Sequence, residues 1–98
     1  MLVAVTYDLN SGWGEVKEAA FARGFFNLLD TSAGQKVAPN TTLFITNTSP
    51  ASAIQLFDQA IAAASAKLGR LIVLERIFVA RVEDWIMNSE PPAKRTAA

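Results

Sequence analysis

Apolar and polar positions along the chain change between strand-like and helix-like spacing. Residues 1–10 begin with an apolar run containing Val and Thr and stop at Asn-Ser-Gly, which is typical of a buried strand. We expect this strand to be central in its sheet and to end at about Asp8. The strand end then places one carboxylate at the rim of the sheet, where a rigid support and an exposed loop favour a functional role.

A short amphipathic helix is predicted next, after a turn at residues 10–12. Ser11 or Gly12 is the candidate N-cap, and Gly24 is the candidate residue that ends the helix. The apolar side chains recur at helical spacing, and we expect them on one face. They are Trp13, Val16, Ala20 and Phe21.

The middle of the chain predicts two strands joined by a loop. Residues 25–29 form a short apolar run that ends at Asp30, and residues 41–47 have an apolar centre with Thr at both ends. Residues 31–40 between them contain Gly, Pro and small polar residues, which indicates a loop. We therefore expect an antiparallel hairpin with a long projecting loop.

A second and longer helix has the clearest boundary signals in the chain. Ser49 is the predicted N-cap, Pro50 is the first helical residue, and Gly69 ends the helix. Apolar residues follow each other at intervals of three and four, so we expect them to form the buried stripe. They are Ile54, Phe57, Ile61, Ala64 and Leu68.

Residues 70–82 form a long apolar segment rich in β-branched residues. It predicts either one overlong strand or two pieces that are broken near Glu75 and Arg76. Residues 88–98 have no periodicity and contain two prolines, so we expect a disordered tail. The folded domain is then residues 1–87.

The order strand, helix, strand, strand, helix, strand predicts an α+β protein with a ferredoxin-like βαββαβ fold. In that fold a four-stranded antiparallel sheet carries both helices on one face. An extra C-terminal strand, or a strand swapped between subunits, is an alternative use of the long last segment. Because the other face of the sheet is uncovered and the last strand is apolar on both sides, we expect a homodimer.

Composition narrows the classes of function. The chain has 98 residues, of which 51% are hydrophobic and 18% are charged, and this balance favours a dimer over a monomer. Nine Lys and Arg residues balance nine Asp and Glu residues, so no overall basic field attracts nucleic acid. The chain has no Cys and no His. Catalysis would therefore rest on other side chains or on a hard cation bound by oxygen atoms.

Targeting signals do not stand out in the sequence. No stretch approaches the roughly 20 apolar residues of a membrane-spanning helix, and no basic segment precedes an apolar one as in a signal peptide. We therefore expect a cytoplasmic protein without a membrane partner.

Three short motifs resemble a known superfamily. They are Tyr-Asp-Leu at the end of the first strand, Asn-Thr-Ser-Pro before the second helix, and Arg-Val-Glu-Asp-Trp after the last strand. They are similar to motifs of the superfamily that joins the CRISPR-associated small adaptation nucleases, the virulence-associated protein D ribonucleases and the SinR-like proteins. The resemblance implies a ferredoxin-like homodimer in which Asp8 of both subunits faces a cleft. It also implies that Asp8 holds Mg²⁺ for hydrolysis of phosphodiesters in RNA or DNA.

Asp8 is therefore the candidate catalytic and metal-binding residue, and one Asp per chain suffices only if a dimer supplies two. Its alternative role is that of a turn-forming or capping acid at the strand end. Asp30 is a candidate second acid, although such a residue more often starts a turn. Asn10, Ser11 and Thr6 are candidates to orient bound water.

Nucleic-acid contacts are assigned to four polar residues. Asn10 lies in the loop after Asp8, Lys36 lies on the predicted long loop, and Arg76 and Arg81 lie on the last strand. Pairing of the basic side chains with Glu75, Glu83 or Asp84 is the alternative. Trp13 and Trp85 are expected to make core or dimer contacts rather than to stack on bases. Few basic side chains near Asp8 could bind phosphate, because no Lys or Arg occurs between Asp8 and Lys17.

Three functional classes remain from the sequence. The first is a metal-dependent endonuclease with Asp8 as a Mg²⁺ ligand. The second is a non-catalytic dimeric module that binds a protein or a nucleic acid through its sheet edge or its long loop. The third is a small-molecule binder or enzyme, which the lack of a convergent polar set disfavours.

Overall fold

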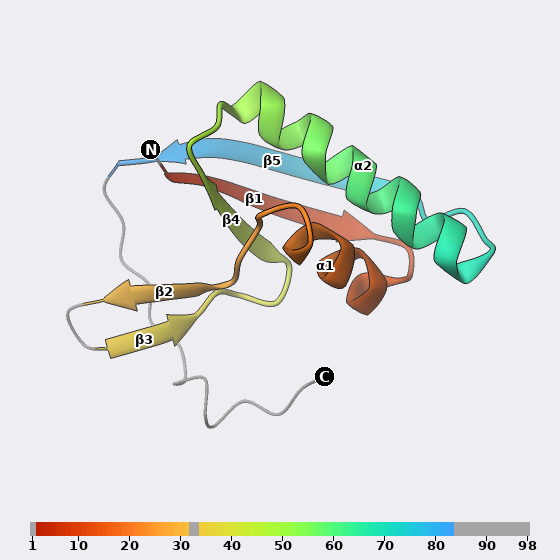
Figure 1. Cartoon of the computed structure of the whole chain (residues 1–98), viewed down its shortest axis with the longest axis horizontal. Coiled ribbons are helices and arrows are strands. Elements are labelled where there is room, and N and C mark those ends of the chain that lie inside the picture. The colour runs from red at the N-terminus through yellow and green to blue at the C-terminus, as the bar shows by residue number, and fades with distance from the viewer. Residues whose placement is uncertain (1, 32–33, 84–98) are drawn as a thin grey trace.

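The computed structural model describes residues 2–31 and 34–83 and has an α+β fold (Figure 1). Five strands and two helices occur in this part of the chain. In order they are β1 (Leu2–Leu9), α1 (Trp13–Phe21), β2 (Leu28–Thr31), β3 (Gly34–Val37), β4 (Thr42–Thr46), α2 (Pro50–Leu68) and β5 (Leu74–Val82). The α+β class predicted from the sequence is confirmed.

β1 is the central strand of the main sheet, as predicted. The sheet has the order β4-β1-β5, and β1 is antiparallel to both neighbours. Every second side chain of β1 is buried, because successive side chains of a strand point to opposite faces. The buried ones are Val3, Val5, Tyr7 and Leu9.

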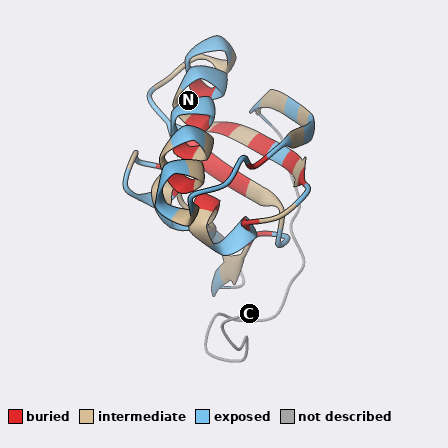
Figure 2. Cartoon of the chain, turned by 90° about the vertical axis from the view of Figure 1, so that its right-hand side faces the viewer, coloured by how far each residue is buried: buried red, intermediate tan, exposed pale blue. Residues whose placement is uncertain are grey.

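Both helices cover the same face of this sheet (Figure 2). The larger cluster of buried residues lies between the two layers, where Phe57 of α2 packs on Tyr7 of β1 with ring centroids 4.7 Å apart. Tilted aromatic contacts at this distance add to the stability that burial itself provides. The prediction of two helices on one face is therefore confirmed.

The ends of α2 lie where the sequence predicts them. The Ser49 hydroxyl accepts a hydrogen bond from the Ser52 N–H at 3.1 Å, Pro50 follows it, and Gly69 has a left-handed φ of 68°. These local signals determine the helix ends because they satisfy backbone groups that lack partners inside the helix.

The predicted buried stripe of α2 is confirmed except at Ile54, since Ile61 and Leu68 also pack against the core. Ala53 and Ala60 are fully buried, whereas the side chain of Ile54 is 37% exposed. Phe57 and Ala64 are buried as predicted. Small alanines allow α2 to lie close to the neighbouring layer, so the buried face includes them and leaves Ile54 near its margin.

The predicted antiparallel hairpin between residues 25–29 and 41–47 is reduced to a single bridge between Phe26 and Phe44. β2 pairs with β3 in a separate two-stranded sheet, in which Leu28 stands opposite Val37. β3 lies within the predicted loop, and the β2–β3 hairpin projects from the main body in Figure 1. A strand formed here because a local hairpin pairs backbone groups that a free loop would leave to water.

A complete ferredoxin-like sheet is not present in the described residues. The main sheet has three strands instead of four, and the second predicted strand meets it only through a bridge between Phe26 and Phe44. Phe26 and Phe44 exchange two backbone hydrogen bonds of 2.8 Å. This contact lies beside a small cluster of buried residues, Leu29, Ala38 and Phe44.

The long last segment, residues 70–82, contains one strand, β5, which begins at Leu74. Its register with β1 shifts between Asp8, which stands opposite Arg76, and Leu9, which stands opposite Leu74. Glu75 is therefore an additional residue on β5, which is the definition of a β-bulge. The alternative of two pieces broken near Glu75 and Arg76 is wrong, because β5 continues through this bulge as one strand. The predicted tail 88–98, together with Asp84 and Trp85, lies outside the described residues.

Candidate functional site

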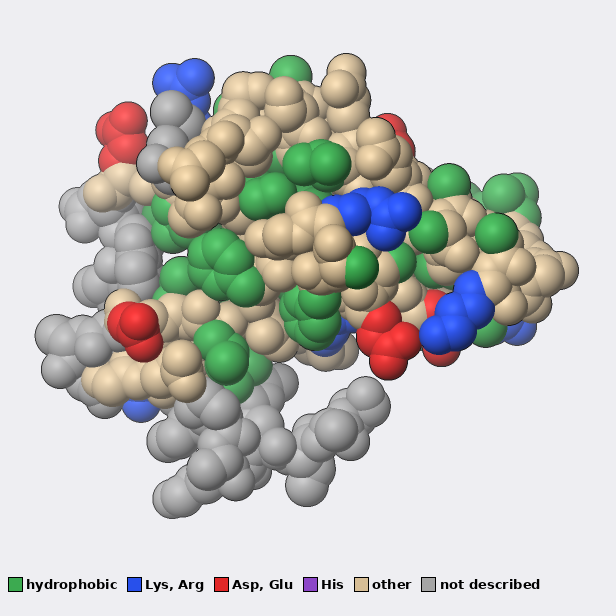
Figure 3. All heavy atoms as spheres, in the orientation of Figure 1, with side chains coloured by type: hydrophobic (Ala, Val, Ile, Leu, Met, Phe, Trp, Pro, Cys, Tyr) green, Lys and Arg blue, Asp and Glu red, His purple; other side chains and the backbone are tan. Residues whose placement is uncertain are grey.

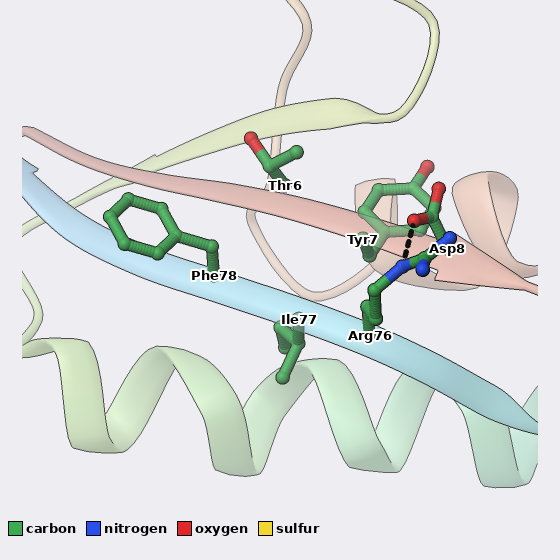
Figure 4. A pocket seen from close by; sticks show the side chains of 6 residues that line it. All are labelled: Thr6, Tyr7, Asp8, Arg76, Ile77 and Phe78. Carbon is green, nitrogen blue, oxygen red and sulfur yellow. Dashed lines mark hydrogen bonds and ion pairs between the residues drawn. The ribbon is translucent and has the colours of Figure 1, made fainter.

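Asp8 and Arg76 form an ion pair on the sheet face that the helices do not cover (Figure 4). We call the uncovered part of this face, on β1 and β5, the open face, because its β4 side packs against the second buried cluster at Ala4 and Phe44. Asp8 and Arg76 are directly opposite each other in the β1–β5 register, next to the bulge. The Arg76 Nε–H donates a hydrogen bond to Asp8 Oδ2 at 2.8 Å.

This ion pair is accessible to solvent. The Asp8 side chain is 48% exposed and the Arg76 side chain is 81% exposed. The hydrogen bond to Asp8 raises the pKa of Arg76 above its usual value, and the negative charges of Asp8 and then Glu75 act in the same direction. Arg76 is therefore a permanent cation beside the candidate metal ligand, and a metal ion at Asp8 would have to displace it.

A surface pocket of about 430 Å³ surrounds the pair. Phe78 lies in it two residues after Arg76, so both side chains belong to the open face, whereas Ile77 points toward α2 in Figure 4. Phe78 is 70% exposed, which is unusual for so large an apolar side chain. The residues that line the pocket are Thr6, Tyr7, Asp8, Arg76, Ile77 and Phe78.

Tyr7 contributes no acid or base to the pocket. Its ring is buried among core side chains, and its hydroxyl has no hydrogen-bond partner in the described part of the chain. Burial raises the pKa of Tyr7 to about 12, because the charged phenolate is poorly solvated there. The hydroxyl therefore stays protonated at neutral pH.

Asn10 has a structural contact that its predicted role did not include. Its Oδ1 accepts a hydrogen bond from the Val73 N–H at 2.8 Å, and its own N–H donates to the Val73 carbonyl oxygen at 3.1 Å. These bonds join the loop after β1 to the segment before β5. Ser11 donates to the same Oδ1 at 3.4 Å, so both residues are occupied with local structure.

The other candidate residues are not brought to Asp8. Asp30 and Lys36 lie on the β2–β3 hairpin, and Arg81 lies five residues after Arg76 on β5. None of these three lines the pocket. In residues 2–31 and 34–83 no group of three or more acidic side chains could hold a metal ion. Thr6 does line the pocket, and its hydroxyl lies 3.2 Å from that of Thr42.

Basic charge does not gather on the face shown in Figure 3. Acidic and basic side chains alternate over it instead of forming one basic stripe. Lys67 on α2, for example, pairs with Glu18 on α1 at 3.4 Å. Mixed charge of this kind does not favour binding to a phosphate backbone.

Phe78 and Ile77 are the residues of the pocket that sequence reasoning missed. The available signal was the two-residue period of the strand, since Arg76 and Phe78 must share a face. The register between β5 and β1 decides whether that face is the open face or the face under the helices. Residue spacing alone does not define this register.

Comparisons of the chain with known protein families, with curated proteins and with solved structures found no match. No helix in the described part is long and apolar enough to cross a membrane.

Proposed function

We propose that the protein is a non-catalytic, homodimeric module that binds a protein partner through its open face. One observation carries this proposal. The carboxylate of Asp8 is held by Arg76 at 2.8 Å instead of standing with other acids as a set of metal ligands in the described residues. A carboxylate that is already paired with an arginine side chain is suited to a structural or recognition role.

The chemistry of the pocket supports binding to a protein. Arg and large aromatic residues are enriched among the residues that dominate protein interfaces, and Arg76 and Phe78 lie exposed on one strand face. The chain has a formal net charge of zero, and the Arg76 charge is already balanced by Asp8. Attraction to nucleic acid depends on several unbalanced cations, so a protein partner fits this surface better.

The architecture supports a ferredoxin-like fold for the domain. In that fold the first strand lies between the last strand and the third, with both pairs antiparallel. The order β4-β1-β5 has this arrangement, and the Phe26–Phe44 bridge occupies the position of the remaining strand. With this fold we propose that the protein is a divergent member of the superfamily that joins the CRISPR-associated small adaptation nucleases, the virulence-associated protein D ribonucleases and the SinR-like proteins.

The test uses Arg76→Ala, with Arg70→Ala as the matched control. Arg70 is an exposed arginine that lies outside the pocket. Peptides selected from a random library on the wild-type protein should bind Arg76→Ala at least about tenfold more weakly and bind Arg70→Ala normally. Equal binding to all three proteins would contradict a recognition role for the pocket. Strong binding to an oligonucleotide that weakens steeply with salt would show that the partner is a nucleic acid and not a protein.

A Mg²⁺-dependent endonuclease is the second candidate, and one observation favours it. Asp8 is half exposed and opens onto a surface pocket, so a hydrated cation could reach its carboxylate. Arg76 is exposed as well, and a solvent-exposed ion pair is easily separated. In a dimer two Asp8 carboxylates would act on one phosphodiester. Loss of metal-dependent cleavage in Asp8→Asn would establish this candidate.

A further inference from the structure

The outer edge of β5 has no partner strand within residues 2–31 and 34–83. β5 has nine residues, and β1 pairs with its inner edge only. The N–H and C=O groups of the other edge are a template for pairing with a further strand. Natural edge strands are commonly short or protected, and β5, which has nine residues, carries three charged residues and a bulge near its start but continues regularly from Arg76 to Val82.

The sequence of β5 complements itself when two copies run antiparallel and Phe78 stands opposite Phe78. A twofold axis perpendicular to the sheet then brings together residues at equal distances from Phe78. By residue count from Phe78, Ile77 stands opposite Val79, and Glu75, which is the residue at the bulge, comes next to Arg81. Each of these pairs occurs twice, so both Glu75–Arg81 pairs are attractive, and Arg76, which is already paired with Asp8, stands opposite Ala80.

Moving the axis by one residue in either direction loses the Glu75–Arg81 match. Because an antiparallel pair keeps opposite residues on the same face, the axis must pass through a residue and can move only in whole steps. With the axis at Ile77, Glu75 stands opposite Val79. With the axis at Val79, Arg81 stands opposite Ile77. Charge therefore selects the register that is centred on Phe78.

The exposed residues of β5 fit the same arrangement. Glu75 and Arg81 are exposed, and neither has a salt-bridge partner in the described part of the chain. Phe78 is 70% exposed on the open face, and in this register it would meet its own copy across the axis. Aromatic pairs directly opposite each other stabilise neighbouring strands, and burial would remove the exposed ring from water.

We infer that two copies of the chain pair antiparallel along β5, with the twofold axis at Phe78, and form one continuous six-stranded sheet. This inference rests on the homodimer of the proposed function and specifies its interface. The two open faces become one surface, on which the Phe78 pair is flanked on each side by an Asp8–Arg76 pair. The partner would therefore meet a symmetric surface made by both subunits.

Charge reversal provides the first test. Arg81→Glu places two acidic side chains opposite each other, and Glu75→Arg places two arginines opposite each other, so each variant should raise the dimer dissociation constant at least about tenfold. The double variant restores opposite charges and should dimerise like the wild type. A mixture of the two single variants should form a heterodimer. In that dimer every acidic side chain at positions 75 and 81 stands opposite an arginine, whereas each homodimer places like charges opposite each other. Sedimentation equilibrium measures all four cases, and circular dichroism confirms that each variant folds.

Cysteine cross-linking provides the second test, because the chain has no cysteine of its own. Phe78→Cys places two thiols opposite each other at the axis, at a separation that suits a disulfide. Ala80→Cys is the matched control on the same strand face. Its two thiols would be four residues apart along the strands, or roughly 13 Å. Oxidation should cross-link Phe78→Cys and leave Ala80→Cys as separate chains.

The outcomes separate the inference from the proposal on which it rests. A dimer that ignores charge reversal and does not cross-link at position 78 would overturn the β5 pairing and leave the homodimer intact. A wild-type protein that stays monomeric at every concentration would overturn both. Cross-linking at position 78 with charge-dependent association would establish the pairing.

Discussion

Asp8 on the central strand and Arg76 on the edge strand lie directly opposite each other, with Arg76 Nε 2.8 Å from Asp8 Oδ2. The β-bulge at Glu75 separates this pair from Leu74, which again pairs in register with Leu9. Bulges redirect side chains at the ends of strands. The sheet thus presents to solvent an acid that already has a cation, beside an exposed Phe78.

Tyr7 should make the protein less stable at high pH. Its pKa is raised to about 12 in the folded chain from an ordinary value of 10.0. Between these two values the unfolded chain loses the phenol proton while the folded chain keeps it, so the free energy of unfolding falls as pH rises. Below pH 10 both states are protonated, and Tyr7 adds no pH dependence there.

Two measurements check this prediction. Tyr7 is the only tyrosine, so the near-ultraviolet absorbance of tyrosinate reports on it alone and should rise near pH 12 in the folded protein. Tyr7→Phe should remove its share of the alkaline destabilisation in urea unfolding. At neutral pH the variant should be as stable as the wild type or more stable, because the lost hydroxyl has no partner in the described residues. Titration near pH 10 would show that the phenol reaches water.

Asn10→Ala should destabilise the protein by about 1 kcal/mol. The substitution removes the acceptor of the Val73 N–H, a bond of 2.8 Å that joins two loops. Asn10→Asp keeps an oxygen at this position and is the matched control, so it should retain most of the stability. Urea unfolding measures both variants. An Asn10→Ala protein as stable as the wild type would show that solvent replaces this bond without cost.

Gly12→Ala should destabilise the protein by more than about 1 kcal/mol. Gly12 has a φ of 73°, and a Cβ there would lie 2.6 Å from Ile72 Cδ1. Both the left-handed backbone and this close contact oppose a side chain. Gly14→Ala is the control inside α1, where a Cβ meets nothing within 4 Å, and it should be neutral or stabilising. A harmless Gly12→Ala, measured by thermal unfolding, would contradict the packing of this loop.

Local signals account for the parts of the fold that the sequence predicts correctly. Ser49, Pro50 and Gly69 mark the ends of α2 because capping depends on residues within one helical turn. The alternating burial of β1 follows from a two-residue period in the same way. The position of Asp8 at the end of the central strand is predictable for this reason.

Long-range pairing accounts for what the sequence does not predict. Leu28 pairs with Val37, and residues 25–29 meet 41–47 only at the Phe26–Phe44 bridge, because two hairpins compete and residue spacing does not rank them. The exposure of Phe78 and the contact of Arg76 with Asp8 depend on a register between segments 68 residues apart. The buried alanines of α2 reflect the shape of the neighbouring layer.

A cleavage assay tests the central claim, that Asp8 pairs with Arg76 for structure and recognition and not for catalysis. The wild type, Asp8→Asn and Arg76→Gln are incubated with labelled single- and double-stranded RNA and DNA, in Mg²⁺, in Mn²⁺ or in chelator. We predict no cleavage by any of the three above the background of the chelator reaction. Metal-dependent cleavage by the wild type that is lost in Asp8→Asn would contradict the binding-module account and assign Asp8 to a nuclease site.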